Sequence, residues 1–184
     1  MELKRVSDSE LIKILLKENS DGLDYHPNFL NDAKINYLLY IIDKIDFETI
    51  YKKPTKYFGL DYTHRKEIHD GKQTEIPEHF NLFKDIIEFD QLVIEYFPLG
   101  VGHTYIRESN MYSDVVLVPL GSFRYTFRKK KEEFTILVER GSALVISGEG
   151  RRLERRVKLR TTDKFNGKKE HREPFYLMTF RKLR

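Results

Sequence analysis

Apolar positions in residues 1–90 recur mainly with the spacing of helices. Asn31 can cap a helix whose buried side is the stripe at i, i+3, i+4 and i+7, formed by Ile35, Leu38, Leu39 and Ile42. Upstream, Ser7-Asp8-Ser9-Glu10 has the form of a capping box and predicts a short helix that ends near Asn19. Pro77 predicts the start of a third helix, with a buried side made of Phe80, Phe83, Ile86 and Ile87.

After Asp90 the pattern changes to short apolar runs separated by turn signals, which is typical of strands. The predicted strands are Gln91–Phe97, Ser113–Pro119, Ser122–Arg128, Phe134–Glu139, Ala143–Ser147, Leu153–Leu159 and Phe175–Arg181. A short extended piece is expected over Leu23–Pro27, strands and loops over residues 50–77, and a long polar loop over Thr161–Pro174.

Two or three helices followed by many short strands predict an α+β fold, in which helices buttress a β-sandwich or jelly roll. The length of 184 residues suits one domain with a sizeable core. We expect a single domain over 1–184, in which residues 1–90 supply helices and additional strands and loops, and residues 91–184 form the jelly-roll core.

Composition excludes several functional classes. The chain has no cysteine, so disulfides, thiolate nucleophiles and zinc–sulfur sites are excluded. No apolar run has the length of a membrane span, and the N-terminus lacks the apolar core of a signal peptide. We therefore expect a soluble protein with no membrane partner, located in the cytoplasm, with the nucleus left open.

The charge is distributed unevenly along the chain. The formal net charge is +4. Residues 151–184 hold 13 Lys/Arg against 4 Asp/Glu, whereas residues 1–150 hold 20 Lys/Arg against 25 Asp/Glu. Ala143–Ile146 forms an apolar run that leads, through the turn signal Ser147-Gly148, into a basic segment over 151–160. This asymmetry predicts a polyanion-binding face on the C-terminal part, or alternatively a solvated strand edge protected by charge.

The N-terminal half offers a second group of candidate ligands. His64 and His69 lie near Asp61 and Asp70, residue types that can bind a metal. Their spacing matches no known metal motif, and histidines on a surface loop are the simpler interpretation.

Several short stretches together resemble the AlkB family of iron(II)- and 2-oxoglutarate-dependent oxygenases. They are GLDYHPNFL at 22–30, YFGLDY at 57–62, EYFPLGV at 95–101, VPLGS at 118–122, LVISGE at 144–149 and MTFR at 178–181. The resemblance extends from about residue 22 to the C-terminus. It implies a double-stranded β-helix, which is a jelly roll, preceded by N-terminal helices.

The same resemblance implies that the iron ligands have been lost. The family holds iron with a His-x-Asp pair and a distant second His. Alignment of the resembling stretches places these positions on Thr104, Ile106 and Arg156. A hydroxyl, an isoleucine and a guanidinium do not make an iron(II) site, so we predict a pseudoenzyme with no catalytic residues, no metal and no cofactor.

The 2-oxoglutarate site is also incomplete. The family's Asn-x-Tyr corresponds to Ile94-Glu95-Tyr96, and its closing Arg-x-x-x-x-x-Arg corresponds to Phe175 through Arg181. Tyr96 and Arg181 are therefore candidate remnants of a carboxylate site, or structural residues, and Phe175 would fill space that a small acid needs.

The alignment leaves one alternative for the metal. A slip of one residue would bring His103 to a ligand position, with Glu108 and His171 as further candidates. A slip also reverses which face a strand residue points to, and no register restores a complete His-x-Asp or His-x-Glu with a downstream His.

The hypothesis that follows is an inactive AlkB-like protein that binds RNA or a ribonucleoprotein, up to the size of a ribosome, as an architectural or inhibitory factor. Tyr105, Tyr112 and Phe165 are candidates for base stacking, or core residues. Lys164 and Arg172 extend the basic segment. The residues expected to contact nucleic acid are Arg128, Lys129, Lys130, Lys131, Arg151, Arg152, Arg155, Arg156, Lys158, Arg160, Lys168 and Lys169. Two alternatives remain: an active iron(II)/2-oxoglutarate nucleic-acid demethylase with displaced ligands, and a pseudoenzyme subunit that binds a protein partner.

Overall fold

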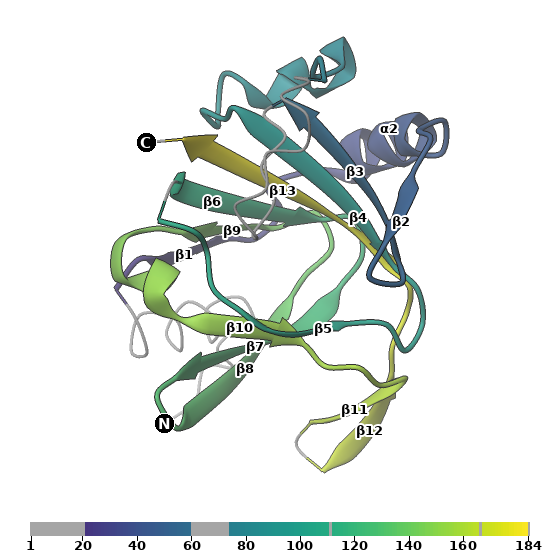
Figure 1. The fold of residues 1–184 in the computed structure, drawn as a ribbon. Coiled ribbons are helices and arrows are strands. Elements are labelled where there is room, and N and C mark those ends of the chain that lie inside the picture. Colours follow the sequence, from purple (N-terminus) through teal and green to yellow (C-terminus); the bar gives the residue numbers. More distant parts are fainter. Residues whose placement is uncertain (1–20, 60–73, 111, 166, 184) are drawn as a thin grey trace, which may run out of the picture.

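Two antiparallel β-sheets face each other in the computed structural model of the chain, which describes residues 21–59, 74–110, 112–165 and 167–183 (Figure 1). The seven-stranded sheet has the order β1 (Leu23–His26), β9 (Ala143–Ile146), β6 (Tyr112–Pro119), β13 (Phe175–Leu183), β4 (Gln91–Phe97), β3 (Lys53–Gly59) and β2 (Glu48–Ile50). The four-stranded sheet has the order β5 (His103–Ile106), β10 (Glu154–Val157), β7 (Phe123–Lys129) and β8 (Glu132–Val138). A separate hairpin joins β11 (Thr162–Phe165) to β12 (Lys168–His171).

Apolar side chains at alternate positions of the strands form one core between the two sheets. Phe123, Tyr125 and Phe127 of β7 face this core, together with residues of β4, β6, β9 and β13. Phe175 is stacked between Phe97 and Phe123, with ring centroids 4.7 and 4.5 Å apart. As expected, Phe175 fills interior space.

A second core lies on the outer face of the seven-stranded sheet, under α2 (Asp32–Ile42) and the 3-10 helix η1 (Glu78–Phe83). The side chain of Asn31 caps α2 and accepts a hydrogen bond from the backbone N–H of Lys34 at 2.9 Å. Ile35, Leu38 and Ile42 are buried, as the periodicity predicts.

The structure confirms the α+β prediction and the jelly roll. The strand predictions hold with small shifts at the ends. β5 was not predicted, and the strands β11 and β12 replace the expected polar loop. The helix expected after Pro77 is a single 3-10 element, and Ser147-Gly148 leads into a second one, η2 (Gly148–Arg152). The predicted helix before Asn19 and the residues Asp61, His64, His69 and Asp70 lie outside the described residues.

In the part of the chain that the structure describes, no helix combines the length and apolar character of a membrane span.

Candidate functional sites: a charged interior cavity and a basic sheet face

The space between the two sheets contains a cavity of about 680 Å³. Strands of both sheets supply its walls. The apolar part includes Val93, Leu117 and Leu177, and the charged part is formed by Lys53, Glu95, Arg155 and Arg181. Tyr51 and Leu159 line the same cavity and are 66% and 63% exposed, so the cavity has a rim that reaches the surface.

Glu108, which follows β5, lies at the centre of a buried ionic network. Its carboxylate accepts hydrogen bonds from Arg155 and from Arg181, the latter with Nε–Oε2 at 3.1 Å. Arg155 Nε also donates to the Tyr125 hydroxyl at 2.8 Å, and Arg181 Nη1 donates to Gln91 Oε1 at 3.3 Å. Two guanidiniums thus share one carboxylate, away from solvent.

Both arginines remain charged in this network. Burial alone would lower the pKa of Arg155, but the contacts with Tyr125 and Glu108 outweigh it and raise the pKa. Burial would likewise lower the pKa of Arg181, but the contacts with Glu108 outweigh it and raise the pKa. Burial raises the pKa of Tyr125 to about 12, so its hydroxyl is neutral and accepts from Arg155.

A second ion pair, between Lys53 of β3 and Glu95 of β4, lies on the cavity wall. Burial would raise the pKa of Glu95, but the Lys53 ammonium outweighs burial and lowers it. His103 of β5 also lines the cavity. Burial lowers the pKa of His103 to about 4, so its imidazole is neutral at pH 7.

The structure corrects two residue assignments by one position. Residues of β10 alternate, so that Arg155 and Val157 point inward while Arg156 points outward to Glu133. In β4, Glu95 lines the cavity, whereas Tyr96 packs on Tyr176 on the helix-covered face, with ring centroids 4.8 Å apart. Arg156 therefore does not occupy an interior ligand position, and Tyr96 is not part of a carboxylate site.

The residues present at the predicted iron position do not fit a divalent cation. Thr104, Ile106 and Arg155 line the cavity where β5 and β10 pair, and the nearby carboxylate of Glu108 is already bound by two guanidiniums. Among the described residues, no group of three or more His, Cys, Asp or Glu side chains could hold a metal. His103 contributes one nitrogen to the cavity wall, beside Lys53 and Arg155, whose positive charges would repel a metal ion.

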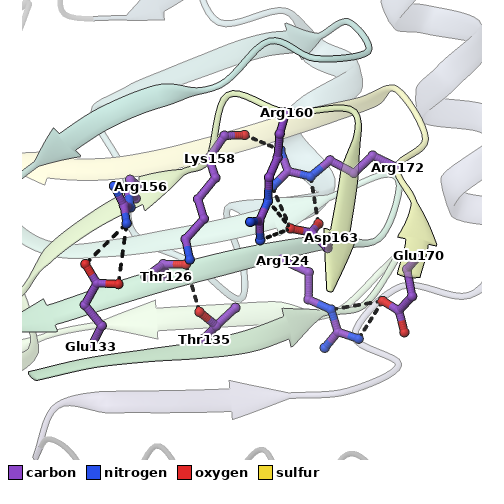
Figure 2. Close-up of polar contacts among 10 residues, drawn as sticks. All are labelled: Arg124, Thr126, Glu133, Thr135, Arg156, Lys158, Arg160, Asp163, Glu170 and Arg172. Atoms are coloured by element: carbon purple, nitrogen blue, oxygen red, sulfur yellow. Dashed lines mark hydrogen bonds and ion pairs between the residues drawn. The ribbon is translucent and has the colours of Figure 1, made fainter. Parts of the chain in front are cut away.

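The outer face of the four-stranded sheet is polar and carries the second candidate site. Arg156 and Lys158 are alternate residues at the end of β10 and just beyond it, and Arg160 follows a bend in which its backbone N–H donates to the Lys158 carbonyl at 3.0 Å, so that the three cations form a row (Figure 2). Arg156 is paired with Glu133 at 3.3 Å, and Arg160 and Arg172 both bind Asp163, at 2.6 and 2.7 Å. Lys158 forms no ion pair with any residue that the structure describes.

Tyr105 lies on the same face, between two guanidiniums. The central carbons of Arg128 and Arg156 are 3.6 and 4.4 Å from its ring centroid, and its hydroxyl donates to Glu133. Because Arg128 and Arg156 already pack over the ring, Tyr105 is not an open platform for base stacking. Tyr112 is buried at the Gln91 side of the ionic network, and the side chain of Phe165 lies outside the described part of the chain.

Exposure divides the predicted nucleic-acid residues into two groups. Arg151 and Arg155 are 6% and 1% exposed, so the prediction that they contact phosphates directly is wrong. Arg151 Nη2 instead donates to the Ser109 carbonyl at 2.6 Å. The remaining predicted residues lie at the surface or are half-buried: Arg128, Lys129, Lys130, Lys131, Arg152, Arg156, Lys158, Arg160, Lys168 and Lys169, together with Lys164 and Arg172.

Sequence reasoning missed most of the cavity. Lys53 had not been considered, and Glu95 had been treated only as the middle of a motif. Glu108 had been considered only as a displaced metal ligand. The sequence of β4 contains a usable signal, since a Glu follows an apolar run inside a predicted strand. A carboxylate buried in this way requires a cation nearby, and this requirement indicates an interior ion pair.

The sheet order, the interior cavity and the covering helix define a double-stranded β-helix. The fold that the resemblance to the AlkB family implies is confirmed by comparison with solved structures. Similar structures include OsALKBH1, with a TM-score of 0.63 and 14% identity, covering 89% of this chain and 99% of that one. A 2OG-Fe(II) oxygenase family protein from Burkholderia pseudomallei has a TM-score of 0.65 and 9% identity, covering 95% and 86%.

A prolyl hydroxylase from Trichoplax adhaerens, solved with a hypoxia inducible factor peptide fragment, is also similar, with a TM-score of 0.54 and 12% identity, covering 95% of this chain and 90% of that one. No family model and no curated protein sequence matches the chain. At these low identities the similarity establishes the fold, and the function must be argued from the residues of this chain.

Proposed function

We propose that this protein is a catalytically inactive AlkB-like protein that binds RNA, alone or within a ribonucleoprotein, through the outer face of its four-stranded sheet. It would act as an architectural or inhibitory factor in the cytoplasm. The inactivity follows from the interior, where arginines and an ion-paired glutamate stand at the position that a metal and its ligands would need.

The observation that carries RNA binding is the row formed by Arg156, Lys158 and Arg160. Burial, with the like charges of Arg160 and Arg156, lowers the pKa of Lys158, which shows that positive charge is crowded at this point. A phosphate group placed against the row would relieve this repulsion. Exposed lysines at the β7–β8 turn and on β12 extend the positive field beyond the row, over Lys129, Lys130, Lys131, Lys168 and Lys169.

Two features favour flexible RNA over a protein partner. The cations outnumber the acids on and around this face: residues 151–172 contain 10 Lys/Arg and 3 Asp/Glu, and 8 cations remain when the buried Arg151 and Arg155 are left out. The side chains that β7 contributes to this face, Arg124, Thr126 and Arg128, are polar, whereas the centre of a protein interface is usually apolar. The expected recognition is therefore mainly of phosphates and independent of sequence.

The test is the affinity for single-stranded RNA, measured by fluorescence anisotropy over a series of salt concentrations. Reversal of charge in Arg156→Glu/Lys158→Glu should weaken binding at low salt by at least about tenfold and reduce the slope of log K against log salt by about 1.4, for two phosphate contacts on a single strand. Lys34→Glu/Lys44→Glu makes the same change of charge in α2 and just after its C-terminal end, on the opposite side of the molecule, and should leave the slope unchanged.

Equal losses in both double variants would mean that only net charge matters, and the face would not be the site. Unchanged, salt-independent binding in Arg156→Glu/Lys158→Glu would also contradict the proposal, and co-purification of a protein without nucleic acid would favour the protein-binding subunit. Retention of one iron per chain, with turnover of 2-oxoglutarate, would overturn the inactive assignment in favour of a demethylase.

A further inference from the structure

Among the described residues, the ionic groups at the interior cavity include more cations than acids. They are Lys53, Arg155 and Arg181, against Glu95 and Glu108. His103 adds no charge at pH 7, because burial keeps its imidazole neutral. An excess charge in a buried position is costly unless a counter-charge is present.

Arg155 is the group at which this excess is least compensated. It is 1% exposed, and its Nε and Nη2 donate to Tyr125 and Glu108, whereas its Nη1 is buried without a hydrogen-bond partner. Buried N–H groups of charged side chains are nearly always partnered in folded proteins. Arg155 lines the cavity, so a ligand in the cavity is placed to supply the missing acceptor.

We infer that the cavity is a binding site for a small organic monoanion, with a single carboxylate at Arg155 and an apolar body between the two sheets. The volume of about 680 Å³ accommodates a small molecule, and Val93, Leu117 and Leu177 provide apolar walls. The exposed Tyr51 and Leu159 mark the route of entry. This inference goes beyond the proposed RNA binding and does not depend on it.

The chain's own residues disfavour a dicarboxylate such as 2-oxoglutarate. Arg181 is held by Glu108 and Gln91, so Glu108 already stands where a second ligand carboxylate would bind. Lys53 is similarly paired with Glu95. The one unpartnered N–H of Arg155 therefore matches one carboxylate.

The experiment compares matched acids and amides on the full chain. Phenylacetate and octanoate are titrated by calorimetry and ligand-observed NMR against phenylacetamide and octanamide, with 2-oxoglutarate as the dicarboxylate. At least one monocarboxylate should bind at least about tenfold more tightly than its amide, the factor expected for a charge-assisted hydrogen bond, and more tightly than 2-oxoglutarate.

Variants locate the bound anion. Arg155→Met should remove the preference for acid over amide, and Leu117→Phe, which narrows the cavity without touching the ionic network, should weaken both ligands. The surface variant Arg156→Glu/Lys158→Glu should retain carboxylate binding, which separates this site from the RNA face. The inference is overturned if neither acid binds better than its amide, if Leu117→Phe has no effect, or if 2-oxoglutarate is the preferred ligand.

Discussion

At the residue scale, Glu108 shows how a single carboxylate can hold two strands together in the interior. Its carboxylate neutralises one of two buried guanidiniums and bridges β10 to β13 through Arg155 and Arg181. An acid in this position is compatible with metal binding, but the arginine beside it occupies the place of a cation. The difference between an iron site and a buried ion network therefore depends on Arg155.

Substitution of Glu108 should be severe. Glu108→Gln would leave Arg155 and Arg181 without the carboxylate that they share, and we expect a loss of about 3–5 kcal/mol in the free energy of unfolding. Urea denaturation followed by circular dichroism measures this loss. Replacement of the whole network, in Glu108→Leu/Arg155→Met/Arg181→Met, should recover most of the loss, because none of the three charges of this network remains buried. A loss in the triple variant at least as large as in Glu108→Gln would show that packing, not charge, explains the effect.

At the scale of elements, the β11–β12 hairpin is attached to the rest of the molecule largely by ion pairs. Asp163 of β11 is 5% exposed and accepts hydrogen bonds from Arg160 and Arg172, while Arg172 also donates to the Lys158 carbonyl. Burial would raise the pKa of Asp163, but the hydrogen bonds from Arg172 and Arg160 outweigh it and lower the pKa. The carboxylate is therefore more acidic in the folded protein than in the unfolded chain.

The linkage between protonation and stability predicts how the hairpin responds to pH. Because the folded pKa of Asp163 lies below the unfolded value, its contribution to stability is complete above pH of about 5 and is lost as the pH falls through the folded pKa. Asp163→Asn should lower stability at pH 7 by about 1–3 kcal/mol and speed amide exchange in β11 and β12. The variant and the wild type should become equal in acid. A difference that persists below the pKa would indicate a steric effect of the amide.

The sequence predicted most strands because their apolar alternation is visible wherever one face is buried, as in β4 and β13. The β11–β12 hairpin was missed because Lys164, Lys168, Lys169 and Glu170 carry no such alternation. The candidate site was predicted in part. The basic face can be predicted from the charge counts. Which side chains point into the cavity depends on the strand register, and a shift of one residue interchanges Arg155 with Arg156 and Glu95 with Tyr96. Loop lengths before these strands set that register, and only the three-dimensional structure resolves it.

At the scale of the whole molecule, the two faces of the four-stranded sheet carry two separate groups of charges. Inward residues hold the ionic network, and outward residues of the same strands form the basic face, so that Arg155 and Arg156 belong to different groups. The helix-covered face of the other sheet carries neither site. This arrangement allows the face and the cavity to be altered independently.

The role of the basic face is tested most sharply by strengthening it. Glu133 restrains Arg156 and accepts from the Tyr105 hydroxyl, so Glu133→Gln removes a negative charge and frees a cation while it keeps a hydrogen-bond acceptor. We expect tighter binding of single-stranded RNA by about threefold at low salt, and a slope of log K against log salt that is steeper by up to about 0.7, for one additional phosphate contact. Glu78→Gln, on η1 above the other sheet, makes the same charge change and should leave the affinity unchanged. Equal gains in both variants would assign the effect to net charge, and no gain in either would show that Arg156 does not meet phosphate.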